Sequence, residues 1–249
     1  MNDKLNLSNV FRLMGRDLML HRWYIIIATL ATLVVMLMIS AFAASRGEGH
    51  PLHAFLVFPL VLLGGGVLIT SIIFNDMHHP RKGHFYMTLP ASRYDKLLAR
   101  FLLSLPGYVI YVCIFFTAYV LLSDAINTLL FQQTHQWPFA TPGALYQPLF
   151  AYLLIHSVFF LGAIWFKRQA AIRTALAAAV AIIFFTAVER LAFLIIFHDI
   201  EIVKLAHLKY AIPITNFPLH LLYNMPWPVL ILTLLCWITA VVRYHEIEA

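Results

Sequence analysis

Six long apolar runs alternate with short polar segments along the 249-residue chain. The runs cover residues 24–44, 52–74, 97–122, 145–166, 174–197 and 227–242. Each approaches or exceeds the roughly 20 residues that a helix needs to cross the hydrocarbon core of a bilayer. Backbone N–H and C=O groups inside lipid must be paired within their own segment, so each run is expected to be a helix. The pattern predicts an all-α membrane protein with six transmembrane helices in one domain, 1–249.

The first 23 residues have a helical periodicity of their own. Apolar side chains recur on one face, and Asn9, Arg12 and Arg16 occupy the opposite face. The apolar positions are Leu7, Val10, Phe11, Met14 and Leu18. An apolar stripe flanked by cations is typical of a helix that lies on an anionic membrane surface. We therefore expect an interfacial helix over 1–23; the alternative is a polar, frayed N-terminus.

Composition and charge agree with a membrane protein. Hydrophobic residues make up 62% of the chain and charged residues only 11%, with a net charge of +6. Most of the 17 Lys and Arg residues precede the first run or follow the second, fourth and sixth runs. The positive-inside rule places these segments, and both termini, in the cytoplasm. The basic charge is thus explained by topology, and no nucleic-acid partner is expected.

The cytoplasmic segment between the second and third runs, residues 75–96, is polar, then aromatic, and then begins a new helix. Ser92 and Asp95 have the spacing of a capping box in front of the third run. Pro90 marks the end of the preceding helical stretch, because the residue before a proline disfavours helix. The segment therefore predicts a short helix near 81–89, a break, and a second helix that enters the membrane. Such an element suits docking to a soluble partner.

Two further features lie inside the runs. Glu189 and Arg190 place charges in the fifth run, nearer its outer end, where charge is costly and often functional. Either Arg190 reaches outward while Glu189 pairs within the bundle, or both line an outer gate or substrate path. In the second run, Gly64, Gly65 and Gly66 are expected to let a neighbouring backbone approach closely.

Catalytic chemistry finds little support. The chain has no Gly-x-x-x-x-Gly-Lys-Ser/Thr motif, so any ATP would be bound by another chain. His78, His79 and His84 form one cytoplasmic cluster, whereas a di-iron centre needs more converging ligands. A histidine-dependent membrane metalloenzyme is one alternative function, and an ion-coupled secondary transporter that uses Glu189 is another. No catalytic residue and no metal site is predicted.

The order of these elements resembles the type-2 ABC transporter permease, the membrane subunit of ATP-binding-cassette exporters. The local match runs from Gly83 to Lys96 (GHFYMTLPASRYDK) and is similar to the family's stretch of Gly, an apolar run and Leu-Pro-x-Ser-Arg, followed by a Lys. Asp76 stands where many members have an acidic residue. The resemblance in topology covers the whole chain, and the resemblance in motif covers about twenty residues.

The resemblance implies a coupling helix around 81–89 that inserts into a groove of a separate ATPase subunit. Its apolar anchors would be Phe85, Tyr86, Met87 and Leu89, its charged rim Arg81, Lys82 and Arg93, with Asp76 and Pro90 at its borders. Residues 1–23, including Phe11, Arg12 and Arg16, would be the family's elbow helix, and short outside helices would fall in 200–225.

The resemblance also implies the partners. A second permease chain, identical or paralogous, would complete the substrate path in the inner membrane of a bacterium. ATP and magnesium would bind in the ATPase subunits and no cofactor in this chain. The histidines and the Glu189–Arg190 pair depart from the family pattern, so the resemblance implies no substrate class.

Overall fold

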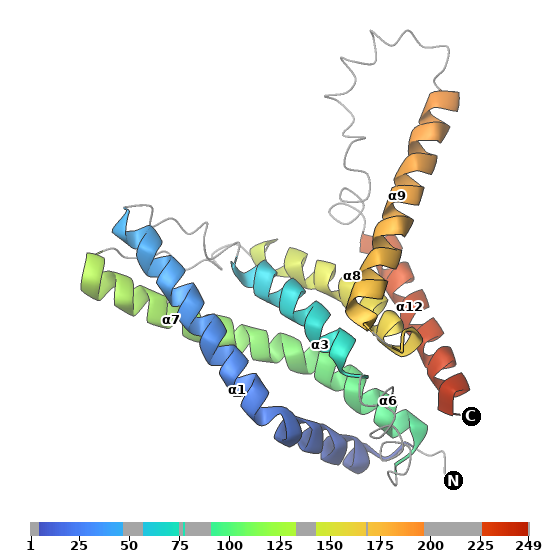
Figure 1. Ribbon diagram of the computed structural model, residues 1–249, viewed down its shortest axis with the longest axis horizontal. Helices are drawn as coiled ribbons and strands as arrows, with labels where there is room; N and C mark the ends of the chain where they lie inside the picture. Colours follow the sequence, from blue (N-terminus) through green and yellow to red (C-terminus); the bar gives the residue numbers. More distant parts are fainter. Residues whose placement is uncertain are drawn as a thin grey trace.

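The computed structural model describes residues 5–46, 57–74, 77, 91–132, 143–167, 169–196 and 226–248, and these residues form helices and short connections without strands (Figure 1). The helices are α1 (Leu7–Ser45), η1 (Val61–Gly65), α3 (Gly66–Ile72), α6 (Arg93–Leu102), η2 (Leu103–Gly107), α7 (Tyr108–Phe131), α8 (Gly143–Trp165), α9 (Ala170–Ile196) and α12 (Pro226–Glu248). Here η1 and η2 are π-helical turns, and each continues directly into an α-helix.

Five helical segments in the described part of the chain are long and apolar enough to cross a membrane. They are α1, the continuous α6–η2–α7 helix, α8, α9 and α12. The helix Val57–Ile72, which includes η1 and α3, is apolar but shorter. These segments indicate a multi-pass, all-α membrane protein.

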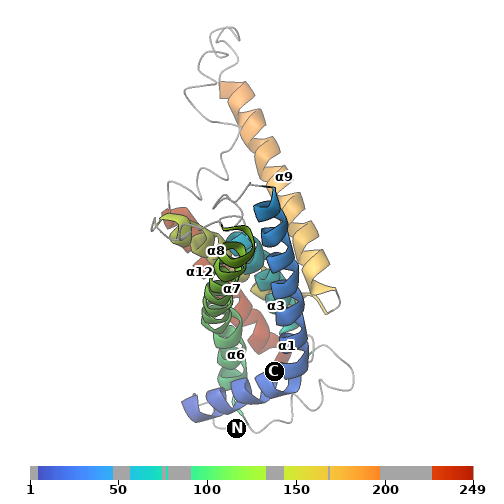
Figure 2. The same cartoon turned by 90° about the vertical axis from the view of Figure 1, so that its left-hand side faces the viewer.

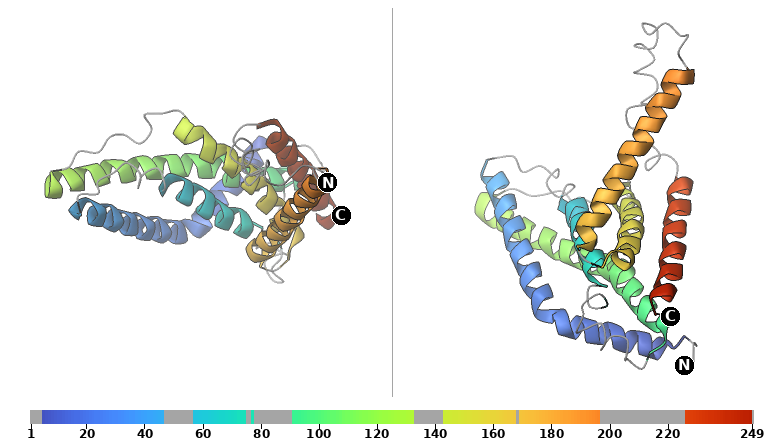
Figure 3. Two further views of the ribbon diagram at one scale, coloured as in Figure 1. Left: turned by 90° about the horizontal axis from the view of Figure 1, so that it is seen from above. Right: turned by 45° about the vertical axis from the view of Figure 1, so that its right-hand side comes forward.

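The helix α8 lies in the middle of the bundle and packs against α3, α9 and α12 (Figure 3). On the other side, α1 runs along α7 and α6. One apolar core joins α1, the second helix (Val57–Ile72), α7 and α8. Its rings include the edge-to-face pair Phe58–Phe116 at 5.2 Å between centroids. A second core joins the end of α3 to α8 and α12, with Phe74 and Phe160 in the same arrangement at 5.2 Å.

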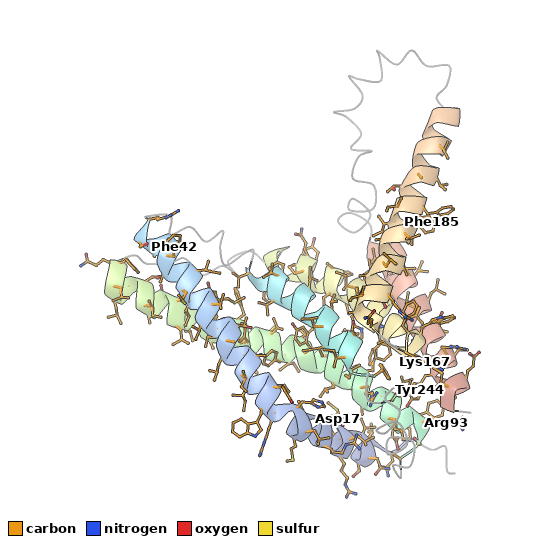
Figure 4. All side chains as sticks on the ribbon, viewed as in Figure 1. Asp17, Phe42, Arg93, Lys167, Phe185 and Tyr244 are labelled. Atoms are coloured by element: carbon orange, nitrogen blue, oxygen red, sulfur yellow. The ribbon has the colours of Figure 1, made fainter. Side chains whose placement is uncertain are left out.

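The N-terminal region differs from the expected separate interfacial helix. A single 39-residue helix begins after Asn6, whose side chain accepts a hydrogen bond from the Ser8 N–H, and runs to Ser45. No Pro interrupts this helix, but it bends into an L, with residues around Asp17 in the short arm (Figures 2 and 4). A helix of this length measures about 58 Å, roughly twice the thickness of a bilayer core. Part of α1 must therefore lie outside the hydrocarbon.

The third helix, which is the continuous α6–η2–α7 segment, is longer than predicted. It begins at Arg93 and continues past the expected end at 122 to Phe131. Two polar residues in the added turns bond to a neighbour. The Asn127 amide N–H donates to Ser40 of α1 at 3.0 Å, and the hydroxyls of Ser40 and Ser123 are hydrogen-bonded to each other. Contacts with α1, which the local sequence does not reveal, thus extend this helix.

The remaining predictions agree with the structure to within a few residues at most ends. The helices α8 and α9 match the expected 145–166 and 174–197, and α12 starts as expected but continues beyond 242 to Glu248. The second helix lies inside the expected 52–74. The short helix predicted near 81–89 and the outside helices predicted in 200–225 fall outside the described residues.

The short arm of α1, the start of α6 and the end of α12 meet at one end of the molecule (Figure 1). Arg93, Tyr244 and Lys167 are at this end, whereas Phe42 is at the opposite end (Figure 4). The start of α6, which follows segment 75–92, therefore lies where the described chain begins and ends.

Candidate functional site

The base of segment 75–92 is the part of the predicted docking element that the structure describes. It consists of the end of α3, Met77 and the start of α6. Eight predicted docking residues lie outside the described part of the chain: Asp76, Arg81, Lys82, Phe85, Tyr86, Met87, Leu89 and Pro90. The ninth, Arg93, is the first residue of α6 and is half-buried.

The start of α6 is fixed by the predicted capping box, which the structure confirms. The Asp95 N–H donates to the Ser92 hydroxyl at 3.1 Å, and the Ser92 N–H donates to the Asp95 carboxylate at 3.2 Å. Two N–H groups that a helix start leaves unpaired are thereby satisfied. The chain that enters α6 from segment 75–92 is therefore held at a defined point.

Asp95 also binds the short arm of α1, a contact that the sequence analysis missed. Its carboxylate accepts from the Asn6 N–H at 2.8 Å and from the Asn9 side chain at 3.4 Å. Asp95 is 1% exposed. Burial by itself would raise the pKa of this carboxyl, but the hydrogen bonds from Asn6, Ser92 and Asn9 outweigh burial and hold the pKa below its ordinary value of 3.8. One charged group thus joins α1 to α6.

Aromatic rings also pack at this end, one of them against the Arg100 guanidinium. The Arg100 guanidinium lies 4.9 Å from the centre of the Phe74 ring, and Lys96 and Arg100 are each only 3% exposed. The Tyr94 ring contacts His245 of α12 at 4.7 Å between centroids. Side chains of α3, α6 and α12 therefore pack together beneath the segment, and α1 joins them through Asp95.

The predicted elbow residues lie on the short arm of α1. Phe11 is 65% exposed and Arg12 is exposed, while Arg16 pairs with the adjacent Asp17 at 2.8 Å. Most of the predicted apolar stripe faces outward, as an interfacial face would, but Val10 is fully buried. The stripe therefore has one member that packs inside the protein.

Glu189 and Arg190 belong to the helix α9, and their side chains are outside the described part of the structure. The end of α9 that carries them extends beyond the other described helices, with Phe185 pointing away from the bundle (Figures 3 and 4). Large apolar side chains are exposed along α9: Leu176, Val180, Ile182, Ile183, Phe184, Phe185, Val188 and Leu191. These side chains lie on all sides of the helix, and no other described helix covers them.

The histidines do not converge among the described residues, where no three His, Cys, Asp or Glu side chains lie close enough to hold a metal ion. His21 and His245 make local contacts to the carbonyls of Asp17 and Val241. His156, in the bundle interior, is 1% exposed and pairs with the Ser104 hydroxyl at 2.9 Å. His78, His79 and His84 lie outside the described residues.

Comparison of the chain with protein-family models, with curated proteins and with solved structures gave no match. Its function therefore has to be argued from its own residues and geometry.

Proposed function

We propose that the chain is the membrane-spanning permease subunit of an ABC exporter, and that separate ATPase subunits bind and hydrolyse ATP with magnesium. The observation that carries the proposal is the resemblance of residues 83–96 to the family's coupling segment, at the point where that segment belongs in the order of helices. In this proposal the chain has no catalytic role of its own.

The packing at the base of the segment supports a mechanical role. A coupling element transmits force only if its ends are held by the helices that must move. Here the start of α6 is capped by Ser92 and Asp95 and tied to Asn6 of α1. Movement of the segment would therefore displace α6 and the short arm of α1 together. Nucleotide binding in the partner would shift the population between inward-facing and outward-facing bundles.

The exposed apolar side chains along α9 support a second permease chain. Lipid can cover the apolar side chains of this helix, but a charged side chain inside the hydrocarbon is costly. Glu189 and Arg190 lie on the end of α9 that leaves the bundle. A second copy or a paralogue packed along α9 would give these residues protein neighbours, and the pair would then line the gate or substrate path between two chains.

The length of α1 supports an elbow arrangement in which the short arm lies on the cytoplasmic surface of a bacterial inner membrane. Phe11 would then face the lipid, with Arg12 and Arg16 near the head groups. Both termini are cytoplasmic in this topology, in line with the basic residues at the same end.

The docking proposal is tested with the double variant Phe85→Asp/Tyr86→Asp. The tagged chain is purified in mild detergent from its own host, and the magnesium-dependent ATPase activity that co-purifies is measured. We expect loss of this activity with unchanged membrane insertion, because two carboxylates would be forced into an apolar groove. The matched control is Leu129→Asp/Leu130→Asp, at exposed positions on the opposite end of the third helix, which should retain the activity. Undiminished ATPase in the Phe85/Tyr86 variant would overturn the proposal.

The second-chain proposal is tested by disulfide cross-linking of membranes. Cys113 and Cys236 are first replaced by Ala, and a single cysteine is introduced at Ile183 of α9, which is 66% exposed, or at Ile110 of α7, which is 60% exposed. We expect a covalent dimer from Ile183→Cys but not from Ile110→Cys. Equal cross-linking at both positions would indicate random collision and remove α9 from the interface.

A further inference from the structure

Both helices that lead to segment 75–92 contain a π-helical turn. The turn η1 directly precedes α3, and η2 directly follows α6. π-helical turns inside α-helices are uncommon and frequently mark functional sites. The hydroxyl of Tyr108, the residue after η2, donates to the carbonyl of Val61, the first residue of η1, at 2.6 Å. The two irregular turns are therefore bonded to each other.

The cause of η2 is visible in its sequence. Pro106 has no N–H to donate to the Leu102 carbonyl, so the regular hydrogen-bond pattern cannot pass this point. A Cβ on Gly107 would lie 3.0 Å from that carbonyl, so glycine permits the close approach of the two residues. The helix thus has a built-in interruption between its cytoplasmic part α6 and its outer part α7.

The neighbouring helix α8 holds η2 through Ser104. The Tyr152 hydroxyl donates to the Ser104 carbonyl, and His156 pairs with the Ser104 hydroxyl. The rings of Tyr108 and Tyr152 lie 5.7 Å apart, and Tyr152 is fully buried. Two tyrosine hydroxyls therefore hold backbone carbonyls of the two π-helical turns.

Glycines make room for these two rings. A Cβ on Gly65 would clash with the Tyr108 hydroxyl, and a Cβ on Gly66 would clash with the Tyr152 ring. The two tyrosines thus sit directly on the junction between η1 and α3. The two π-helical turns, the glycines and the two tyrosine hydrogen bonds therefore lie together in one region of the bundle.

We propose that η1 and η2 form a paired hinge, at which α3 and α6 turn together relative to the outer parts of their helices, with the hydroxyls of Tyr108 and Tyr152 holding the hinge in the state described here. The short arm of α1 follows α6 through Asp95. Only the driving force, a partner that moves segment 75–92, rests on the proposed function. The ten-residue α6 is an arm of about 15 Å, so a turn of about 20° moves its start by about 5 Å.

The hinge is tested by spin-label distance measurements on the full chain in lipid nanodiscs, without any partner. Cys113 and Cys236 are replaced by Ala, and labels are placed at Tyr94→Cys of α6 and Ile172→Cys of α9, both exposed. Tyr108→Phe and Tyr152→Phe, alone and together, each remove one oxygen atom. In these variants we expect a second population of the 94–172 label distance, shifted by about 5 Å, because the Val61 and Ser104 carbonyls lose their hydrogen-bond donors.

Two controls separate a hinge from general loosening. The label pair Ile114→Cys and Ile183→Cys reports the outer part of α7 against the same reference helix and should not change. Tyr111→Phe also removes one hydroxyl. That hydroxyl bonds to Thr29 of α1 at 2.6 Å, and the Tyr111 ring, which stacks on Tyr108 at 6.1 Å, is retained in the variant. Tyr111→Phe should therefore not produce the second population.

An unchanged 94–172 distance in both hinge variants would overturn the proposal. An equal change in the control pair or in Tyr111→Phe would also overturn it. A failure of the hinge variants to fold would do the same, because the proposal gives the two hydroxyls the role of selecting the hinge conformation and not that of stabilising the bundle. Since no ATPase is present, a negative result here leaves the co-purification test of the proposed function unaffected.

Discussion

The three adjacent glycines of the second helix offer a matched set of substitutions. Gly64, Gly65 and Gly66 are alike in sequence, yet a Cβ would meet nothing within 4 Å at Gly64, the Tyr108 hydroxyl at Gly65 and the Tyr152 ring at Gly66. Each glycine is replaced by alanine in turn. The three variants share the same chemical change at adjacent helical positions and differ in what the added methyl group contacts.

The expected magnitudes follow from those contacts. Replacing glycine by alanine inside a helix stabilises it by about 0.5–1 kcal/mol. Gly64→Ala should show this gain undiminished. At Gly66 the added carbon overlaps the ring of Tyr152, which is fully buried and hydrogen-bonded to the Ser104 carbonyl, so overpacking of about 1–3 kcal/mol is expected. Because the helical gain is common to both variants, Gly66→Ala should be less stable than Gly64→Ala by about 1–3 kcal/mol.

Gly65→Ala adds a test of the contact itself. The nearest atom to its Cβ is the Tyr108 hydroxyl oxygen, whereas the nearest ring carbon is 3.4 Å away, an ordinary contact. Tyr108→Phe should therefore relieve the clash, and the double variant should be more stable than the sum of the two single changes predicts, by about 0.5–3 kcal/mol.

Stability is measured as the apparent midpoint of thermal unfolding in detergent, followed by loss of the monodisperse gel-filtration peak. A difference of about 1–3 kcal/mol corresponds to a midpoint difference of several degrees for a chain of this size, roughly 2–4 °C per kcal/mol. Equal midpoints for the Gly64 and Gly66 variants would refute the packing argument. Additive effects of Gly65→Ala and Tyr108→Phe would refute the assigned contact.

Three further outcomes are expected from polar contacts. Asp95→Ala should destabilise the attachment of the short arm of α1 by about 1–3 kcal/mol, measured as faster tryptic cleavage at Arg12, because the Asn6 N–H and the buried Ser92 N–H lose their acceptor. In the unchanged chain, the pKa of Asp95 is lower in the folded state than its ordinary 3.8. The stability that the ionised carboxylate gives to the attachment of α1 is therefore complete above pH 3.8 and is lost as the pH falls through the lowered pKa. The rate of cleavage in the short arm should rise only in acid, measured with an acid-active protease. Asn127→Leu should lower the unfolding midpoint by the equivalent of about 1–3 kcal/mol, because the buried Ser40 hydroxyl loses a donor, and an unchanged midpoint would contradict that role.

The local sequence was sufficient for some features and insufficient for others of the same kind. The capping box at Ser92 and Asp95 was predicted because both partners lie within one helical turn. The bond from Asn6 to Asp95 was not, because 89 residues separate the partners. The glycines were correctly expected to permit a close approach, but tyrosine side chains make that approach, where a neighbouring backbone was expected. Most of the predicted docking residues lie outside the described part of the chain, so those assignments remain predictions.

The sequence by itself determined where the helices are, because an apolar run inside lipid must pair its own backbone groups and therefore becomes helical whatever surrounds it. It also determined the start of α6, through a cap that is local. Tertiary structure decided the rest: that the short arm of α1 is one continuous helix with the first span, that the third helix extends to Phe131, and that two irregular turns lie together at the Tyr108–Tyr152 pair. These features depend on hydrogen bonds and ring contacts between helices that are distant in the chain. The hydrophobic periodicity of one helix does not predict which other helix packs against it.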